Sequence, residues 1–361
     1  MNQVRGIRGA RARASFRGCL LGGAVGDALG AAIEFKSLPD IRAEFGPAGL
    51  RDFGMAYGRL GAITDDTQMT LFTAEALLRA EHLRHRTPRG RVAEVAWHAY
   101  LRWLETQGDV VQHHGIPDEE GWLVRVRDLR TVRGPGKTCL AALRKGRMGT
   151  PEVPINDSKG CGGVMRVAPA GFTPGDPFRL GAELAAITHG HTTGWLAAAY
   201  LAQLVHDVAS GATLDEGAAR ALEVLRRHPG HEETASAVER ALLLSRAPGG
   251  TAASVESLGQ GWVAEEALAI GLHAALVAED FEHGVLLAVN HSGDSDSTGA
   301  IAGSLLGLTL GELAIPRRWL ERLELHDVIE QVADDLHHHF GTGSLPCAGG
   351  QCGTWARYPP G

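Results

Sequence analysis

Apolar residues recur every three or four positions along most of this chain, which is the spacing of the buried face of a helix. No stretch alternates apolar and polar residues as a half-buried strand does, and no Asn-Gly turn is present. The pattern therefore predicts an all-α protein with one compact domain. The predicted helices are Phe16 to Ile33, Met69 to Leu83, Val92 to Leu104, Thr138 to Arg144, Phe178 to Thr188, Trp195 to Val208, Ala218 to Arg227, Glu233 to Leu244, Val263 to Ala278, Gly299 to Gly307, Trp319 to Leu323 and Val328 to His338.

The regions without this spacing predict loops and chain ends. Residues 37–62 contain prolines and several glycines, which predicts a long surface loop. Residues 1–14 are rich in arginine and predict a disordered arm, residues 15–340 form the expected domain, and residues 341–361 predict a flexible tail of Gly and Pro. The three histidines at 337–339 are expected to form a solvated helix end.

Glycines line one face of two predicted helices. They recur at four-residue steps, which keep them on nearly the same helical face. A glycine inside a helix costs about 1 kcal/mol relative to alanine, so the two series indicate that a neighbouring backbone comes very close. We expect both helices to be central, with each other as the candidate partner; a composition rich in glycine, with 48 in all, is the alternative. The positions are Gly18, Gly22, Gly26 and Gly30 in the first helix and Gly299, Gly303, Gly307 and Gly311 in the second.

Composition narrows the class of protein. The chain has 361 residues, of which 44% are hydrophobic and 21% charged, as in a globular protein with a sizeable core. A net charge of −7 argues against a nucleic-acid binder, which usually shows a basic stripe. No run of about 18 apolar residues occurs, so the sequence predicts no membrane-spanning helix. The five scattered cysteines fit a reducing compartment, and we expect a cytoplasmic protein.

Two predicted helix starts each combine hydroxyl residues with a pair of aspartates. Thr64, Asp65 and Asp66 precede one helix, and Asp294 and Asp296 stand among serines at the start of another. Acids at a helix N-terminus are partly ordinary capping, because unpaired N–H groups and the helix dipole favour negative charge there. The same oxygens also suit a hard divalent cation. The repetition of the motif favours the metal hypothesis and leaves capping open.

Other polar features are candidates for the same site. Residues 160–163 include three glycines, which let backbone N–H groups converge on an anion, although a plain turn is also consistent. His189 lies in a helix connection, as a site residue or a packed loop residue. Glu34 follows the first helix, where the dipole disfavours a carboxylate, and such conflicts often mark functional sites; a surface glutamate is the alternative. The arginines between 125 and 133 predict a solvated face or a contact with an anionic substrate.

If both helix starts point into one cleft, five carboxylates crowd together there. They belong to Glu34, Asp65, Asp66, Asp294 and Asp296. Like charges at that density require cations or large pKa shifts, and two divalent ions would nearly neutralise them. Short oxygen ligands favour Mg²⁺ or Mn²⁺ over Zn²⁺. Such a pair can hold an oxygen-rich substrate and activate a water, and a Gly-rich anion loop nearby would suit a phosphorylated sugar.

Together these motifs resemble the ADP-ribosylglycohydrolase family, which includes the dinitrogenase reductase-activating glycohydrolases and the vertebrate ADP-ribosyl hydrolases. The resemblance runs from Phe16 to Leu310, with the motifs in the family's order. It implies an all-α fold with a binuclear Mg²⁺ or Mn²⁺ centre that hydrolyses the glycosidic bond between ADP-ribose and a protein side chain. The matching motifs are Gly26-Asp27-Ala28-Leu29-Gly30 with Glu34, Thr64-Asp65-Asp66-Thr67, the loop from Gly160 to Arg166, His189, and Gly293-Asp294-Ser295-Asp296-Ser297.

The resemblance also implies a role for each matching residue. Glu34, Asp65 and Asp294 are implied as catalytic residues. The family often has threonine where Ser297 stands, and serine keeps the hydroxyl. The implied metal ligands are Thr64, Asp65, Asp66, Asp294, Asp296 and Ser297. The implied ADP-ribose contacts are Gly160, Cys161, Gly162, Gly163, Val164 and Met165 at the pyrophosphate and His189 near the ribose.

Several substrates fit this resemblance. We expect an ADP-ribosylated protein with arginine-linked ADP-ribose, since that linkage resembles the commonest activity of bacterial-looking relatives. Serine-linked ADP-ribose and O-acetyl-ADP-ribose are alternatives within the family. Two alternative functions belong to other classes of protein: a non-catalytic binder of ADP-ribose, and a two-metal phosphodiesterase that cuts the pyrophosphate. The intact acidic set argues against the binder, which would not need five carboxylates.

Overall fold

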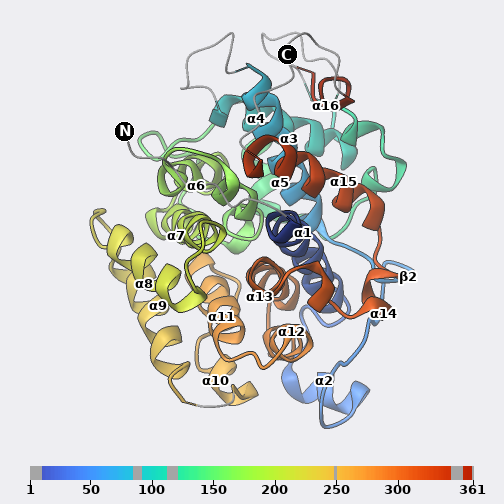
Figure 1. The fold of residues 1–361 in the computed structure, drawn as a ribbon, viewed down its shortest axis with the longest axis vertical. Helices are drawn as coiled ribbons and strands as arrows, with labels where there is room; N and C mark the ends of the chain where they lie inside the picture. The colour runs from blue at the N-terminus through green and yellow to red at the C-terminus, as the bar shows by residue number, and fades with distance from the viewer. Residues whose placement is uncertain (1–9, 84–91, 112–120, 248–249, 343–352, 360–361) are drawn as a thin grey trace.

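The computed structural model describes residues 10–83, 92–111, 121–247, 250–342 and 353–359. These residues are mostly helical, and their strands form one short antiparallel hairpin, so the predicted all-α fold is confirmed. Figure 1 shows the helices arranged around a central pair, α1 (Ala10–Gly30) and α13 (Ser295–Leu310).

The remaining elements cover this pair. In the first half of the chain they are α2 (Leu38–Phe45), β1 (Met55–Ala56), β2 (Arg59–Leu60), α3 (Asp65–Leu83), α4 (Val92–Thr106), the 3-10 turns η2 (Leu123–Arg125) and η3 (Arg127–Leu129), α5 (Lys137–Leu143), η4 (Cys161–Gly163), η5 (Ala168–Phe172) and α6 (Pro177–Ala186). In the second half they are α7 (Thr192–Ala209), α8 (Leu214–Leu225), α9 (Glu232–Leu244), α10 (Ala252–Glu256), α11 (Ala264–Leu276), α12 (Phe281–Val289), η6 (Glu312–Ala314), α14 (Arg317–Leu320), α15 (His326–Leu336), the π-turn η7 (His337–Gly341) and α16 (Gly353–Arg357).

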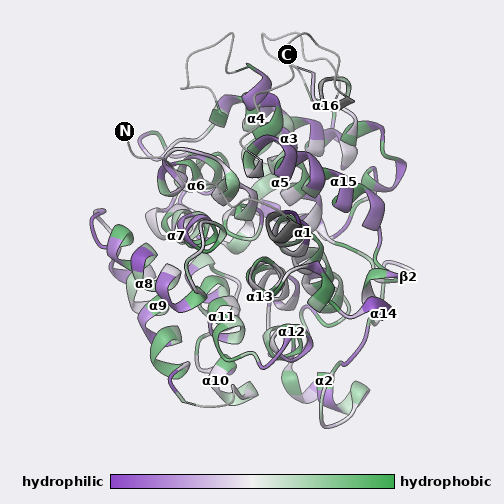
Figure 2. Cartoon of the chain, in the orientation of Figure 1, coloured by the Kyte–Doolittle hydropathy of each residue, from purple (hydrophilic) through white to green (hydrophobic). Residues whose placement is uncertain are grey.

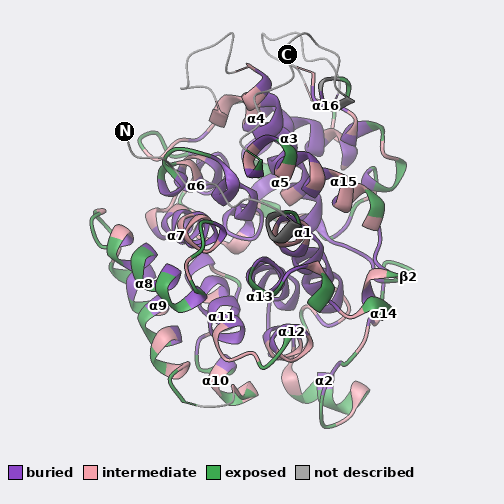
Figure 3. Ribbon diagram, in the orientation of Figure 1, coloured by how far each residue is buried: buried purple, intermediate pink, exposed green. Residues whose placement is uncertain are grey.

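The two glycine series meet at the contact between α1 and α13. A Cβ atom added to Gly26 would lie less than 3.0 Å from the carbonyl group of Gly299, and the same holds for Gly22 with Gly303 and for Gly18 with Gly307. The two backbones therefore touch directly along most of the contact, as the glycine spacing predicted. The pair is buried, and so is most of α3, α7 and α11 around it (Figure 3).

Hydrophobic side chains fill the space between the central pair and the surrounding helices. One cluster of buried apolar residues runs through every layer, from Phe16 on α1 to Trp319 on α14. Figure 2 shows the outer helices α8 and α9 alternating between hydrophobic and hydrophilic ribbon, with the polar side turned outward. This is the one-sided pattern that the apolar spacing predicted for surface helices.

The loop predicted at residues 37–62 contains regular structure. Helix α2 begins there because the Ser37 hydroxyl caps it and a proline occupies its first turn. A hairpin follows, in which Tyr57 and Gly58 both adopt positive φ (49° and 79°) as a two-residue turn requires. The strands are two residues long, and tyrosine is uncommon at positive φ, so the sequence carries no hairpin signal.

Both ends of the chain differ from the predicted arm and tail. Helix α1 begins at Ala10 rather than after residue 14, and Arg13 and Arg17 bind Asp334 on α15. At the other end, α16 is followed by Tyr358, which is fully buried. Residues 1–9 and 343–352 lie outside the described residues. The ordered parts depend on partners far away in sequence, which periodicity does not reveal.

The histidine run also differs from the solvated helix end that was predicted. His339 is buried and packs edge-on against His82 of α3, with ring centroids 4.9 Å apart. His338 alone of the three is exposed. The run therefore belongs partly to the core.

The glycine contact predicts a large penalty for any side chain within it. Replacing Gly303 by alanine (Gly303→Ala) should lower the free energy of unfolding by about 3 kcal/mol, because the added methyl meets the rigid Gly22 carbonyl rather than a side chain. Gly217→Ala on α8 is the matched control, since its Cβ would meet side-chain atoms of Leu204, Val208 and Asp207 rather than a backbone. Urea unfolding followed by circular dichroism measures both. Equal stability of the two variants would contradict the contact.

Candidate active site

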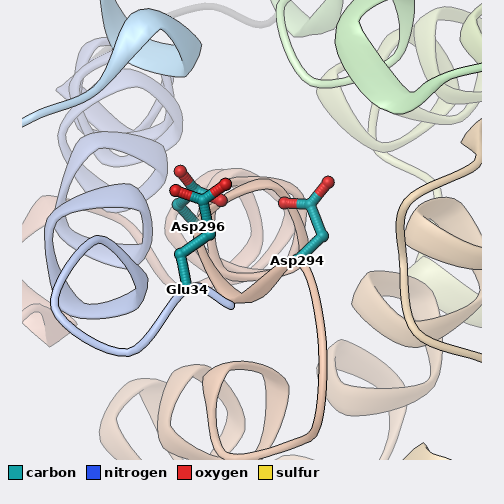
Figure 4. A group of neighbouring side chains, drawn as sticks. All are labelled: Glu34, Asp294 and Asp296. Atoms are coloured by element: carbon teal, nitrogen blue, oxygen red, sulfur yellow. The ribbon is translucent and has the colours of Figure 1, made fainter. Parts of the chain in front are cut away.

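The α1–α13 contact brings Glu34 to the start of α13. A Cβ on Gly30, the last residue of α1, would clash with the backbone of Ser295 and Asp296, so the chain leaving α1 lies directly on the α13 N-terminus. Glu34 follows in that turn. One ligand oxygen each from Glu34, Asp294 and Asp296 lie within 4.8 Å of one another. Figure 4 shows the three carboxylates directed to the same side of the α13 N-terminus.

The start of α13 is held by its own aspartates. Asp294 is the N-cap, and its Oδ1 accepts a hydrogen bond from Ser297 N at 3.2 Å; Asp296 Oδ1 accepts from the same N–H at 2.9 Å. Asp294 N in turn donates to the Gln260 carbonyl at 2.8 Å. The preceding Gly293 has φ +142° and no room for a side chain. Capping is thus present, and it fixes the carboxylates that form the cluster.

The start of α3 carries the second pair of aspartates. Asp65 is buried; its backbone N donates to the Arg133 carbonyl at 2.9 Å, and its Oδ2 accepts from Gly136 N at 3.0 Å. The Thr64 hydroxyl accepts from Asp66 N at 3.2 Å. Asp66 Oδ1 is buried and accepts no hydrogen bond from any residue that the structure describes. A buried anionic oxygen of this kind is costly without a cation.

A buried aspartate on α1 holds this second helix start, and its role was missed in the sequence. The carboxylate of Asp27 accepts from Thr64 N at 3.0 and 3.1 Å, from Thr67 N at 3.1 Å and from the Thr67 hydroxyl. Asp27 therefore caps α3 from another helix. The available signal was a charged residue on a face that is otherwise glycine and apolar.

Burial and mutual repulsion raise the pKa values of the clustered acids. Burial raises the pKa of Glu34 to about 10, and the charges of Asp296, Asp294 and Asp65 contribute to the shift. The pKa values of Asp65, Asp66 and Asp294 are also well above the ordinary range, chiefly through burial, with repulsion from Asp296 in every case. Asp65 and Asp66 lie outside the group of Glu34, Asp294 and Asp296, but the charge of Asp296 raises the pKa of both. The two helix starts therefore lie close enough for their charges to interact.

The glycine loop lies against the same cluster. The Cys161 thiol donates to Asp294 Oδ2 at 2.8 Å, and Met165 Sδ lies 3.8 Å from the Ser297 hydroxyl. A Cβ on Gly162 would lie 2.9 Å from the His189 ring, so the loop also packs on that histidine. The structure thus brings the predicted loop, Ser297 and His189 together beside the acids.

His189 is held neutral in this position. The side chain is buried, and burial together with the nearby Arg166 lowers its pKa to about 3. Its Nδ1 lies 2.9 Å from the Thr188 hydroxyl. A neutral imidazole offers its other ring nitrogen for a hydrogen bond to a polar ligand.

Only part of the predicted arginine face is solvated. Arg125, Arg127 and Arg130 are exposed, as expected. Arg133 is buried, and its guanidinium binds Glu324 at 2.8 Å. The prediction was wrong for Arg133 because its partner lies almost two hundred positions away in the chain.

The residues present fit a divalent cation. Carboxylates and hydroxyls supply all the candidate donors, which suits hard ions. The partnerless oxygen of Asp66 and the raised pKa values of the buried acids both fit a group of oxygens that can take a cation as partner. The structure therefore supports a cation site at the two helix starts.

The chain belongs to the ADP-ribosylglycohydrolase family. The family model matches residues 8–345, which is nearly the whole chain. A solved structure described as an ADP-ribosylglycohydrolase-related protein complex superposes with a TM-score of 0.66 and 28% identity, covering 91% of this chain and 99% of that one. Family membership supports a hydrolase that acts on ADP-ribose linkages.

Relatives from three organisms align over most of their length. A protein of Archaeoglobus fulgidus is 30% identical over 89% of this chain and 95% of its own. The ADP-ribosyl-[dinitrogen reductase] glycohydrolase of Rhodospirillum rubrum is 28% identical, over 85% and 90%. The ADP-ribosylarginine hydrolase Tri1 of Pseudomonas putida is 24% identical, over 89% and 77%. Among the described residues, no helix is both long and apolar enough to cross a membrane.

The raised pKa of Glu34 predicts a pH-dependent stability in the metal-free protein. Folding raises this pKa from 4.5 to about 10, so the folded state retains a proton that the unfolded chain releases. The free energy of unfolding should therefore fall as the pH rises from the lower value towards the higher. Glu34→Gln should flatten this slope, whereas Glu239→Gln, at an exposed partner of Arg226, should not. Urea unfolding in EDTA across this range measures the effect, and identical slopes in wild type and Glu34→Gln would contradict it.

Proposed function

We propose that this protein hydrolyses the glycosidic bond between ADP-ribose and an arginine side chain of a modified protein, with two Mg²⁺ or Mn²⁺ ions. The observation that carries the proposal is the group of Glu34, Asp294 and Asp296, with the glycine loop against it and the second acidic helix start near enough for its charges to interact with Asp296. The arginine linkage is supported by the relative named as an ADP-ribosylarginine hydrolase. The proposed metal ligands are Thr64, Asp65, Asp66, Asp294, Asp296 and Ser297.

The protein's own residues divide the work of the reaction. The bond between ribose C1′ and the guanidine nitrogen breaks through an oxocarbenium-like transition state, and a water adds to C1′. Glu34, with its raised pKa, holds a proton at the edge of the cluster and can give it to the leaving nitrogen; its carboxylate can then take a proton from water. The bound ions would supply charge that holds the ribose hydroxyls and orients the water.

The glycine loop and His189 would hold the rest of the substrate. The loop at Cys161–Gly163 forms the turn η4, and backbone N–H groups in such turns favour phosphate oxygens. The neutral ring of His189 lies beside this loop and can bind a ribose hydroxyl. These contacts would place C1′ next to Glu34.

The nature of the product tests the reaction. Mass spectrometry after incubation with Mg²⁺ should show intact ADP-ribose released from an arginine-linked substrate, and slower release from serine-linked protein and from O-acetyl-ADP-ribose. AMP with ribose phosphate would instead mark a pyrophosphatase. No product from any substrate, despite binding of ADP-ribose, would mark a non-catalytic relative.

The cluster aspartates can be tested without disturbing the helix caps. Asp294→Asn and Asp65→Asn should each nearly abolish turnover while the fold stays intact, because the cation ligand is lost. Asp176→Asn on α6 is the matched control for Asp294→Asn: Asp176 is also an N-cap, accepting from Arg179 N at 2.9 Å, and asparagine caps equally well. Turnover near the wild-type rate in both cluster variants would overturn the binuclear mechanism.

A further inference from the structure

A second buried carboxylate lies close behind the start of α3 and has no part in the cluster. Glu324 sits between α14 and α15 and is 1% exposed. Its Oε1 binds Arg133 and Arg59, each at 2.8 Å, and its Oε2 accepts from Ile63 N at 3.1 Å. Figure 1 shows β2 and α14 side by side at this edge of the molecule.

The backbone around Glu324 is tightly constrained. Glu324 N donates to the Gly61 carbonyl at 2.9 Å, and a Cβ on Gly61 would clash with the Arg322 carbonyl. The next residue, Leu325, adopts φ +58°, which costs a bulky residue about 1–3 kcal/mol. A residue keeps a strained backbone conformation only where its surroundings fix it, so the backbone beside Glu324 is held in one conformation.

Two contacts of Glu324, those with Arg133 and with Ile63 N, lead to Asp65. Ile63 immediately precedes Thr64 at the α3 start. Arg133 contributes the carbonyl that accepts from Asp65 N at 2.9 Å, and three residues later Gly136 N donates to the Asp65 carboxylate at 3.0 Å. The guanidinium of Arg133 also lies 5.2 Å from the ring of Tyr57 in the hairpin. Glu324 therefore contacts both chain segments next to Asp65, the 133–136 segment through the ion pair and Ile63 through a hydrogen bond.

A buried ion pair is weak evidence for a contribution to stability, because desolvation offsets the attraction. The Arg133 and Glu324 side chains are 8% and 1% exposed, so their charges have little contact with water. In some proteins such a pair instead specifies a defined geometry. Here the geometry is that of the segment on which Asp65 rests.

We propose that Glu324, through its ion pair with Arg133, is a positioning residue that sets the orientation of the Asp65 carboxylate for cation binding. This inference rests on the proposed function, because it takes Asp65 as a cation ligand. Replacing a residue that holds a metal ligand in place typically lowers metal affinity or activity by about 10–100-fold. Glu324 touches neither substrate nor cation and acts only through the 133–136 segment and Ile63.

The test measures Mn²⁺ affinity by calorimetry and electron paramagnetic resonance, separately from activity. Glu324→Gln keeps the shape of the side chain but places an N–H group among donors, so Mn²⁺ affinity should fall about 10–100-fold. Arg133→Met removes the same pair from the other side and should give a similar loss. Thermal unfolding in EDTA reports the stability of each variant.

Asp335→Asn is the matched control. Asp335 is also a buried carboxylate that binds an arginine, Arg357, at 2.7 and 2.9 Å, but its partners hold the C-terminal segment rather than the α3 start. Its Mn²⁺ affinity should equal that of the wild type even if its unfolding temperature falls.

The outcomes separate the two proposals. Wild-type protein that binds no Mn²⁺ would overturn the proposed function itself. If the wild type binds Mn²⁺ and both Glu324→Gln and Arg133→Met bind it equally tightly, the positioning role alone is overturned. An equal loss of affinity in Asp335→Asn, or failure of Glu324→Gln to fold while Asp335→Asn folds, would show a purely structural role and overturn it as well.

Discussion

The backbone contact between α1 and α13 is the constraint on which the rest of this structure depends. Side chains as small as a methyl group would separate the two helices, so glycine is required at each crossing. The close approach sets Gly30 against Ser295 and Asp296, and this places Glu34 beside the second acidic helix start. A packing requirement in the middle of the protein therefore determines the distance between carboxylates at its end.

The site gathers negative charge against a clear electrostatic penalty. Burial and repulsion raise the pKa of Glu34 to about 10 and that of Asp27 to about 7, and three cluster aspartates shift in the same direction. Such an arrangement survives only on a rigid support, since any freedom would let the carboxylates move apart or into water. The glycine contact, the Asp27 cap and the Glu324 ion pair each supply part of that support.

The sequence predicted the parts of the molecule that are encoded locally. Apolar periodicity predicted most of the longer helices, four-residue glycine steps predicted the central pair, and the paired acids at one helix start predicted part of the acidic group of Glu34, Asp294 and Asp296. Features that depend on a distant partner were not predicted. The hairpin turn needs a positive φ at Tyr57, which a tyrosine in the sequence does not indicate. Arg133 is buried against Glu324, and Arg357 of α16 binds Asp335 of α15. The composition near these residues predicts loops or exposed side chains instead.

Capping and cation binding were competing interpretations of the acidic motifs, and the structure shows how one helix start can serve both. At α13 the Oδ1 atoms of Asp294 and Asp296 both accept from Ser297 N, and Asp294 Oδ2 remains to accept from the Cys161 thiol of the glycine loop. At α3 the N–H groups of Thr64 and Thr67 are capped instead by Asp27 from α1. Because that cap comes from another helix, neither aspartate of the α3 start has to serve these N–H groups, and Asp66 Oδ1 remains without a protein donor among the described residues. This division of oxygens lets one helix start serve both the fold and the proposed cation site.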